Sequence, residues 1–169
     1  MGRKRFDQMD CSVAQALDVL GDWWTLLIVR DAFMGSKRFG EFESSQGIAK
    51  NVLTDRLGQL VEHGIFERVP TSPQQRRCEY RLTDKGHALL PVITSLRQWA
   101  DRWIYGEGEE PMVVVDRELG EPVQQLTLTS RDGRPLRSSD LRVQPGPGAS
   151  PELRELLQRV ARPEREATS

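Results

Sequence analysis

The hydrophobic period of the chain changes within residues 49–82, and this change constrains the fold more than any other feature. Residues 49–63 carry apolar side chains at helical spacing, at Val52, Leu53, Leu57, Leu60 and Val61. Gly64 follows, and residues 65–69 and 77–82 then alternate between apolar and polar. A period of 3.6 indicates an amphipathic helix, and a period of 2 indicates a half-buried strand. The sequence therefore predicts a helix followed by a β-hairpin, the arrangement of a small wing.

Three further helices are predicted before this point and one after it. Residues 12–20 and 38–42 form short helices, whereas residues 23–34 are apolar almost all round, as expected for a helix at the centre of a core. The last helix, residues 84–105, has an apolar face, and Pro91 is expected to kink or break it near its start. The first part of the chain is therefore mainly helical.

The composition changes after a Gly- and Glu-rich linker that begins at Gly106. Residues 112–116 and 123–129 are predicted strands, and residues 151–160 a short helix. The end of the chain is expected to be disordered. This pattern predicts two parts, a helical domain over residues 1–105 and a short β-rich extension over residues 106–169.

Charge is distributed unevenly around a formal net charge of −1. Residues 1–105 hold 15 basic and 13 acidic side chains, whereas residues 106–169 hold 9 and 12. Any binding to nucleic acid must therefore come from the local placement of cations. No apolar run reaches the roughly 20 residues of a membrane span, and no apolar stretch of a signal peptide follows the basic start. We expect a cytoplasmic protein without a membrane partner.

The sequence contains no recognisable catalytic or metal-binding arrangement. Cys11 and Cys78 lie far apart, with no Cys-x-x-Cys and no Cys/His cluster beside them. His63 and His87 belong to no pattern of a nucleophile, a phosphate loop or a metal site. We therefore expect no enzyme, no metal and no cofactor.

Motifs over residues 10–103 occur in an order that resembles one family. They are Cys11 to Gly21, Trp24 to Arg30, Arg38-Phe39 with Phe42, Gly47-Ile48, Leu53-Thr54 with Arg56-Leu57 and Leu60, Gly64 to Arg68, and Glu79-Tyr80 with Leu82-Thr83 and Gly86. The chain resembles the HxlR-type regulators, which are related to the MarR repressors. The resemblance implies a mainly α fold with a small β wing, a winged helix-turn-helix that forms a helix-mediated homodimer. It also implies a transcription regulator, acting as a repressor, that binds a pseudo-palindromic site in double-stranded DNA.

Two sets of side chains are expected to contact DNA. The first turn of the 49–63 helix presents Lys50, Asn51 and Thr54 outward, where they can read base edges in the major groove. A second set is expected to hold phosphates: Lys37, Arg38, Arg56, Gln75, Arg76 and Arg77. Arg56 has an alternative role, a bond to a carboxylate or carbonyl within the protein. Ala49 cannot cap the helix, which forfeits on the order of 1 kcal/mol.

The resemblance also implies a dimer interface built from the first and last helices. Its predicted members are Val13, Leu17, Leu20, Leu89, Ile93, Leu96, Trp99 and Trp103. The alternative is that Trp99 and Trp103 pack under the C-terminal strands of the same chain.

Cys11 is the one residue that the sequence offers as a sensor. It stands just before a helix N-terminus, a position that raises thiol reactivity, and it matches a cysteine with which some HxlR-type regulators sense oxidants or quinones. The alternative is an inert, partly buried cysteine, and Cys78 is expected to serve packing. Two other functions stay open: a winged helix used only for protein interaction, and a small-molecule sensor with a Trp-rich pocket.

Overall fold

The computed structural model describes residues 6, 9–71 and 77–161. Its internal contacts divide the chain into two compact units, Met1–Gln15 with Thr127–Ser169, and Ala16–Leu126. Within the described residues, no one helix is long and apolar enough to cross a membrane. Helices α1 (Ser12–Leu20) and α2 (Trp23–Phe33), bent by 78° at the break between them, meet that criterion only when they are counted together. The predicted boundary after residue 105 stays a prediction.

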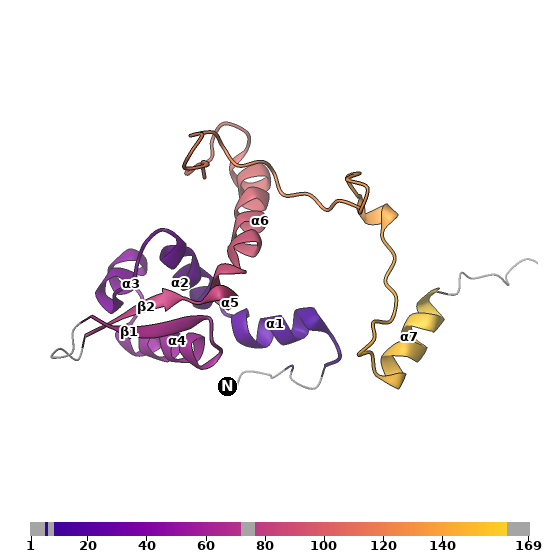
Figure 1. Ribbon diagram of the computed structural model, residues 1–169, viewed down its shortest axis with the longest axis horizontal. Helices are drawn as coiled ribbons and strands as arrows, with labels where there is room; N and C mark the ends of the chain where they lie inside the picture. The colour runs from indigo at the N-terminus through magenta and orange to yellow at the C-terminus, as the bar shows by residue number, and fades with distance from the viewer. Residues whose placement is uncertain (1–5, 7–8, 72–76, 162–169) are drawn as a thin grey trace, which may run out of the picture. The chain divides into compact units, whose positions relative to one another are not determined.

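Four helices precede the wing, as predicted. They are α1 (Ser12–Leu20), α2 (Trp23–Phe33), α3 (Phe39–Gln46) and α4 (Lys50–Glu62). Helix α3 runs four residues beyond its predicted end and stops at Gly47, whose φ of 61° is the left-handed conformation that ends helices. Figure 1 shows α2, α3 and α4 gathered in one cluster with the two strands.

The predicted hairpin is confirmed. Strands β1 (Phe66–Pro70) and β2 (Cys78–Leu82) pair antiparallel. In this register Phe66 lies opposite Leu82, and Arg68 lies opposite Tyr80. Side chains of directly opposed residues project from the same face of a sheet, so the Arg68 side chain shares a face with the Tyr80 ring.

The core joins the helices to the wing. Its buried apolar side chains come from α2, α3, the turn before α4, α4 itself and the start of the hairpin: Ile28, Val29, Phe42, Ile48, Leu53, Leu57, Leu60, Ile65 and Phe66. The rings of Phe42, Phe66 and Tyr80 meet edge to face, with centroids 6.2–6.5 Å apart. Such aromatic pairs stabilise beyond the area that they bury. They hold both strands against α3.

The helix predicted over residues 84–105 is divided into three pieces. These are α5 (Asp84–His87), α6 (Leu90–Ala100) and a π-helical turn (Asp101–Tyr105). The chain breaks before α6, as predicted from Pro91. Proline interrupts a helix because it lacks an N–H and its ring clashes with the carbonyl four residues earlier.

A turn at the start of α5 fastens this helix to the end of α4. The Thr83 hydroxyl accepts a hydrogen bond from the Gly86 N–H (3.2 Å) and donates one to the Gly64 carbonyl (2.6 Å). Gly86 is buried so closely that a Cβ atom there would lie 2.3 Å from the carbonyl oxygen of Ile65. Only glycine fits this contact without a shift of the backbone.

The segment after the π-helical turn differs from its prediction. In place of strands over residues 112–116 and 123–129, the structure has single β-bridges, Val115 with Pro122 and Thr129 with Pro135. A proline in each bridge has no N–H, so the ladder cannot grow. The side-chain amide of Gln98 on α6 forms hydrogen bonds with this backbone in the way that a neighbouring strand would. It donates to the Gln124 carbonyl and accepts from the Leu126 N–H.

In the other unit, α7 (Pro151–Ala161) confirms the predicted C-terminal helix. The Ser150 N–H just before it donates to the Asp10 carboxylate at 2.7 Å, and this bond holds the pKa of Asp10 below its usual value. Residues 162–169, for which disorder is expected, lie outside the described residues.

Candidate nucleic-acid interface

Helix α4 turns one side to the core and the other to solvent. Leu53, Leu57 and Leu60 are buried, whereas Lys50, Asn51 and Thr54 lie exposed near its first turn. Because the buried leucines anchor α4, the three polar side chains are held on a fixed outer face. The structure therefore places them outward, as the sequence predicts.

The first turn of α4 makes few bonds of its own to other elements. The Lys50 ammonium lies 3.8 Å from the Glu43 carboxylate of α3, and the Thr54 hydroxyl donates to the Lys50 carbonyl. Ala49 precedes α4 and makes no side-chain cap bond, as predicted. No capping side chain therefore accepts a hydrogen bond from the amide N–H groups of this turn. These groups, at the positive end of the helix dipole, remain available to an anion.

Arg56 lies against the protein instead of projecting from it. Its guanidinium forms an ion pair with Asp22, the residue that caps the N-terminus of α2, and it also lies 3.2 Å from the Asp55 carboxylate. Its side chain is 21% exposed. This geometry favours the alternative role, in which Arg56 joins α4 to α2, over a phosphate contact.

Lys37 and Arg38 lie exposed at the start of α3. The Glu41 carboxylate accepts hydrogen bonds from both of their backbone N–H groups, at 2.7 and 2.9 Å. The bond from Lys37 and then that from Arg38 hold the pKa of Glu41 below its usual value. The charged carboxylate therefore fixes the turn from which the two cationic side chains project.

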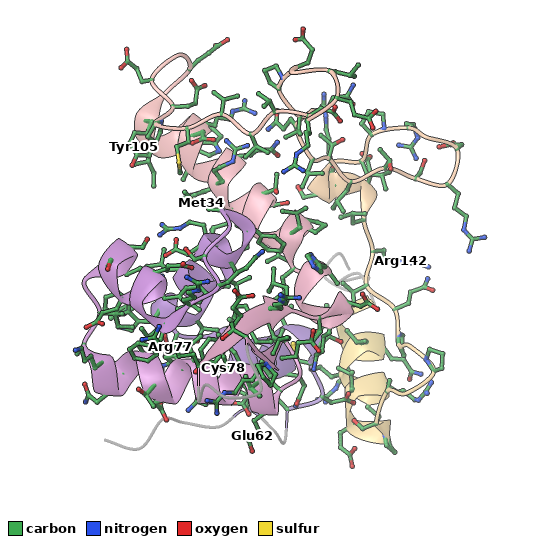
Figure 2. The ribbon with its side chains drawn as sticks, turned by 60° about the vertical axis from the view of Figure 1, so that its left-hand side comes forward. Met34, Glu62, Arg77, Cys78, Tyr105 and Arg142 are labelled. Carbon is green, nitrogen blue, oxygen red and sulfur yellow. The ribbon has the colours of Figure 1, made fainter. Side chains whose placement is uncertain are left out.

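The wing contributes Arg77, which is exposed immediately before β2 (Figure 2). Gln75 and Arg76 lie outside the described residues. A cavity of about 480 Å³ lies beside the loop end of the hairpin and is lined by Arg38 of the α3 turn and by Arg68, Arg77, Cys78 and Tyr80 of the hairpin. This cavity is called the wing cavity below.

Sequence reasoning missed Arg68. Its Nε–H donates to the Cys78 sulfur at 3.3 Å, and its guanidinium lies 5.7 Å from the centre of the Tyr80 ring. The bond to Cys78 raises the pKa of Arg68, and burial raises the pKa of the Tyr80 phenol. The arginine is thus charged and the phenol neutral near pH 7. Pairing the two strands in register would have brought Arg68 to this face.

The eight residues predicted for a dimer interface divide into two groups. Leu20, Leu89 and Ile93 are half-buried and pack on the core of their own chain. The others are exposed: Val13, Leu17, Leu96, Trp99 and Trp103. Trp99 is 56% and Trp103 66% exposed, so residues 106–126, which follow in the same unit, bury neither ring.

The two cysteines are both free thiols. Cys11 is exposed directly before α1, and Cys78 is half-buried at the start of β2. In the part of the chain that the structure describes, no group of three His, Cys, Asp or Glu side chains could hold a metal ion.

A second cavity, of about 670 Å³, lies beside α6. Its lining comes from α6, the π-helical turn and residues 107–125, and includes Arg97, Arg102 and Val113 but no tryptophan. This cavity is therefore not the Trp-rich pocket considered from the sequence, which stays a prediction.

Helix α3, the turn at Gly47, helix α4 and the β1–β2 hairpin together form a winged helix-turn-helix, the fold of a large class of DNA-binding transcription factors. The model of the HxlR-like helix-turn-helix family matches residues 19–107. The chain belongs to this family of transcription regulators.

Individual relatives agree with this assignment. The HTH-type transcriptional regulator Rv3095 of Mycobacterium tuberculosis is 37% identical over 84% of this chain and 90% of its own length. PA1607, a protein assigned to the transcription factors, has a solved structure that is 47% identical, with a TM-score of 0.77 over 83% of this chain and 99% of its own. The redox regulator HypR in its reduced form is 30% identical, with a TM-score of 0.51 over 54% and 91%.

Proposed function

We propose that this protein is a repressor that binds a pseudo-palindromic operator in double-stranded DNA as a homodimer. The observation that carries the proposal is the exposed first turn of α4, with Lys50, Asn51 and Thr54 on the face opposite the core. A regulator of this kind acts in the cytoplasm, where bacterial DNA is accessible.

Helix α4 has the dimensions of a recognition helix. Its 13 residues span about 20 Å, and its N-terminal end fits a major groove about 12 Å wide. Asn51 is suited to bond an adenine edge in two places, and Lys50 to reach a guanine or a phosphate once it leaves Glu43. Lys37, Arg38 and Arg77 flank this helix and are suited to hold the backbone phosphates.

The salt dependence of DNA binding tests this proposal. Each cation that contacts a phosphate adds about 0.9 to the slope of log K against log salt concentration. We expect Lys50→Ala and Arg77→Ala each to weaken binding and to lower this slope by about 0.9, measured by fluorescence anisotropy on duplex DNA. Lys85→Ala is the matched control, because Lys85 bonds the His63 carbonyl just beyond the C-terminal end of α4.

A winged helix used only for protein interaction is the competing function. It predicts no salt-dependent binding of duplex DNA beyond background and no change for Lys50→Ala or Arg77→Ala. Either result would reject direct DNA reading.

We propose further that thiol chemistry at Cys11 regulates DNA binding. The support is its exposure beside α1 and the similarity to the redox regulator HypR. We expect hydrogen peroxide or a quinone to change the DNA affinity of the native protein and of Cys78→Ser, but not of Cys11→Ser, in a mobility-shift assay. A Cys11→Ser protein that responds as the native protein does would refute this role.

A further inference from the structure

The wing cavity gathers positive charge at one place on the surface. Three arginines line it, Arg38, Arg68 and Arg77, and none of the described lining residues is acidic. Glu79 forms ion pairs with Arg38 at 3.7 Å and with Arg81 at 2.9 Å but is not among the lining residues. Three guanidinium groups around one hollow favour an anion.

The backbone holds these arginines in place from two elements. The Tyr80 N–H of β2 donates to the Lys37 carbonyl at 2.7 Å, which fixes the start of α3 against the wing. Arg68 lies across from Tyr80 in the ladder, and its bond to Cys78 uses Nε only. The four N–H groups on its two Nη atoms stand outside that bond, and they are the donors with which arginine grips a phosphate.

The elements that line the cavity pack against the helix that is suited to read DNA. Helix α4 contacts both α3 and β1, and the cavity is lined from the start of α3 and from the hairpin, with no residue of α4 among its described lining residues. When a helix N-terminus enters the major groove, the elements that flank it meet the sugar-phosphate backbone. A backbone phosphate is therefore the anion best placed to reach this cavity.

We propose that the wing cavity binds a phosphate of the DNA backbone, so that the contact surface extends beyond the wing tip to Arg68 and brings the phosphate beside the thiol of Cys78. This inference rests on the proposed DNA-binding function but names a site that the function alone does not require. Arg68 supplies the charged fork, and the neutral Tyr80 phenol adds a hydroxyl donor.

The thiol makes the site measurable without DNA. The sequence has two cysteines, so Cys11→Ser leaves Cys78 as the single thiol. In alkylation, the sulfur forms a bond to carbon while the carbon–iodine bond breaks, iodide leaves and the thiol proton passes to solvent. The quantity to measure is the rate of alkylation by anionic iodoacetate divided by the rate of alkylation by neutral iodoacetamide. We expect this ratio to be several-fold higher for Cys78 than for the thiol of an unfolded Cys peptide.

Two further variants assign this preference to the cavity. Arg68→Met keeps an apolar stem without the charge, and we expect it to return the ratio of the two rates to that of the peptide. Arg81→Met removes a cation from the same hairpin that does not line the cavity, and it should leave the ratio raised. A ratio in the Cys11→Ser protein no higher than in the peptide would overturn the proposal.

The same alkylation measured with duplex DNA present tests whether the phosphate comes from DNA. With a 20-base-pair duplex at low salt, we expect saturation to slow Cys78 alkylation at least tenfold. Arg68→Met should weaken binding roughly tenfold, as expected for a hydrogen bond to a charged group, and lower the salt slope by about 0.9.

The outcomes separate this inference from the proposed function. If the duplex binds with a salt-dependent affinity but Cys78 stays fully reactive, the protein reads DNA and the phosphate site is wrong. If no duplex binds while iodoacetate is still preferred, the cavity holds anions, and both the DNA source and the proposed function are rejected.

Discussion

Replacing Gly86 with alanine is expected to destabilise the folded protein by about 1–3 kcal/mol, the usual range for overpacking, or by more because the clash is with backbone. The added methyl group would lie 2.3 Å from the Ile65 carbonyl oxygen and 2.9 Å from a Leu82 methyl carbon. Relief of this clash must move α5 away from the end of α4 and stretch the Thr83 bonds to Gly64 and Gly86. Urea unfolding followed by circular dichroism measures the effect.

Gly58 provides the matched control in the same chain. It lies exposed in the middle of α4, and a Cβ atom there has no neighbour within 4 Å. Alanine lowers the entropy of the unfolded chain and favours helix, so Gly58→Ala should stabilise by roughly 0.5–1 kcal/mol. Equal effects of the two substitutions would show that the contact between Gly86 and Ile65 does not limit stability.

Leu96→Glu is expected to convert the proposed dimer into a monomer. Val92, Leu96, Trp99 and Trp103 recur at three- and four-residue spacing on α6 and the π-helical turn, and all are exposed in the single chain. A stripe of this composition is suited to a two-fold interface, where an unpaired charge costs about 3–5 kcal/mol. We therefore expect dimer affinity to fall more than a hundredfold.

The measurement is the molar mass in sedimentation equilibrium at micromolar concentration, with operator affinity as the second readout. Leu119→Glu places the same charge at another exposed leucine, in the loop after Asp116, and should leave the mass unchanged. A native protein that is already monomeric at this concentration would refute the dimer. A dimer that survives Leu96→Glu would place the interface on another surface.

Several residues show why local pattern predicted much of the fold. The spacing of Leu53, Leu57 and Leu60 predicts which side of α4 is buried, because a helix repeats every 3.6 residues whatever surrounds it. Pro91 predicts the break before α6, because its missing N–H and its ring act on its own helix. The apolar residues at 112–116 and 123–129 predict strands, but Pro122 and Pro135 each stand in a single bridge, where the missing N–H prevents a longer ladder.

The candidate site was predicted only in part. Lys50, Asn51 and Thr54 follow from the helical period, since each lies off the apolar stripe. Arg56 lies off the same stripe, but Asp22, 34 positions earlier, forms an ion pair with it. Arg68 was read as one residue of a short strand, and its contacts with Cys78 and Tyr80 depend on strand pairing.

The sequence by itself determined the amphipathic helix and the hairpin wing of residues 49–82, and the outward face of α4, because hydrophobic periodicity acts through neighbours a few positions apart. The tertiary structure alone decided what the charged side chains do. Whether a guanidinium is held by a carboxylate, as in Arg56, or lines an open hollow, as in Arg68, depends on residues brought together from distant positions. Electrostatic contacts act over a few ångströms in space and have no period along the chain. The wing predicted from a change of period thus becomes, in three dimensions, a wing with a cationic cavity beside its loop end.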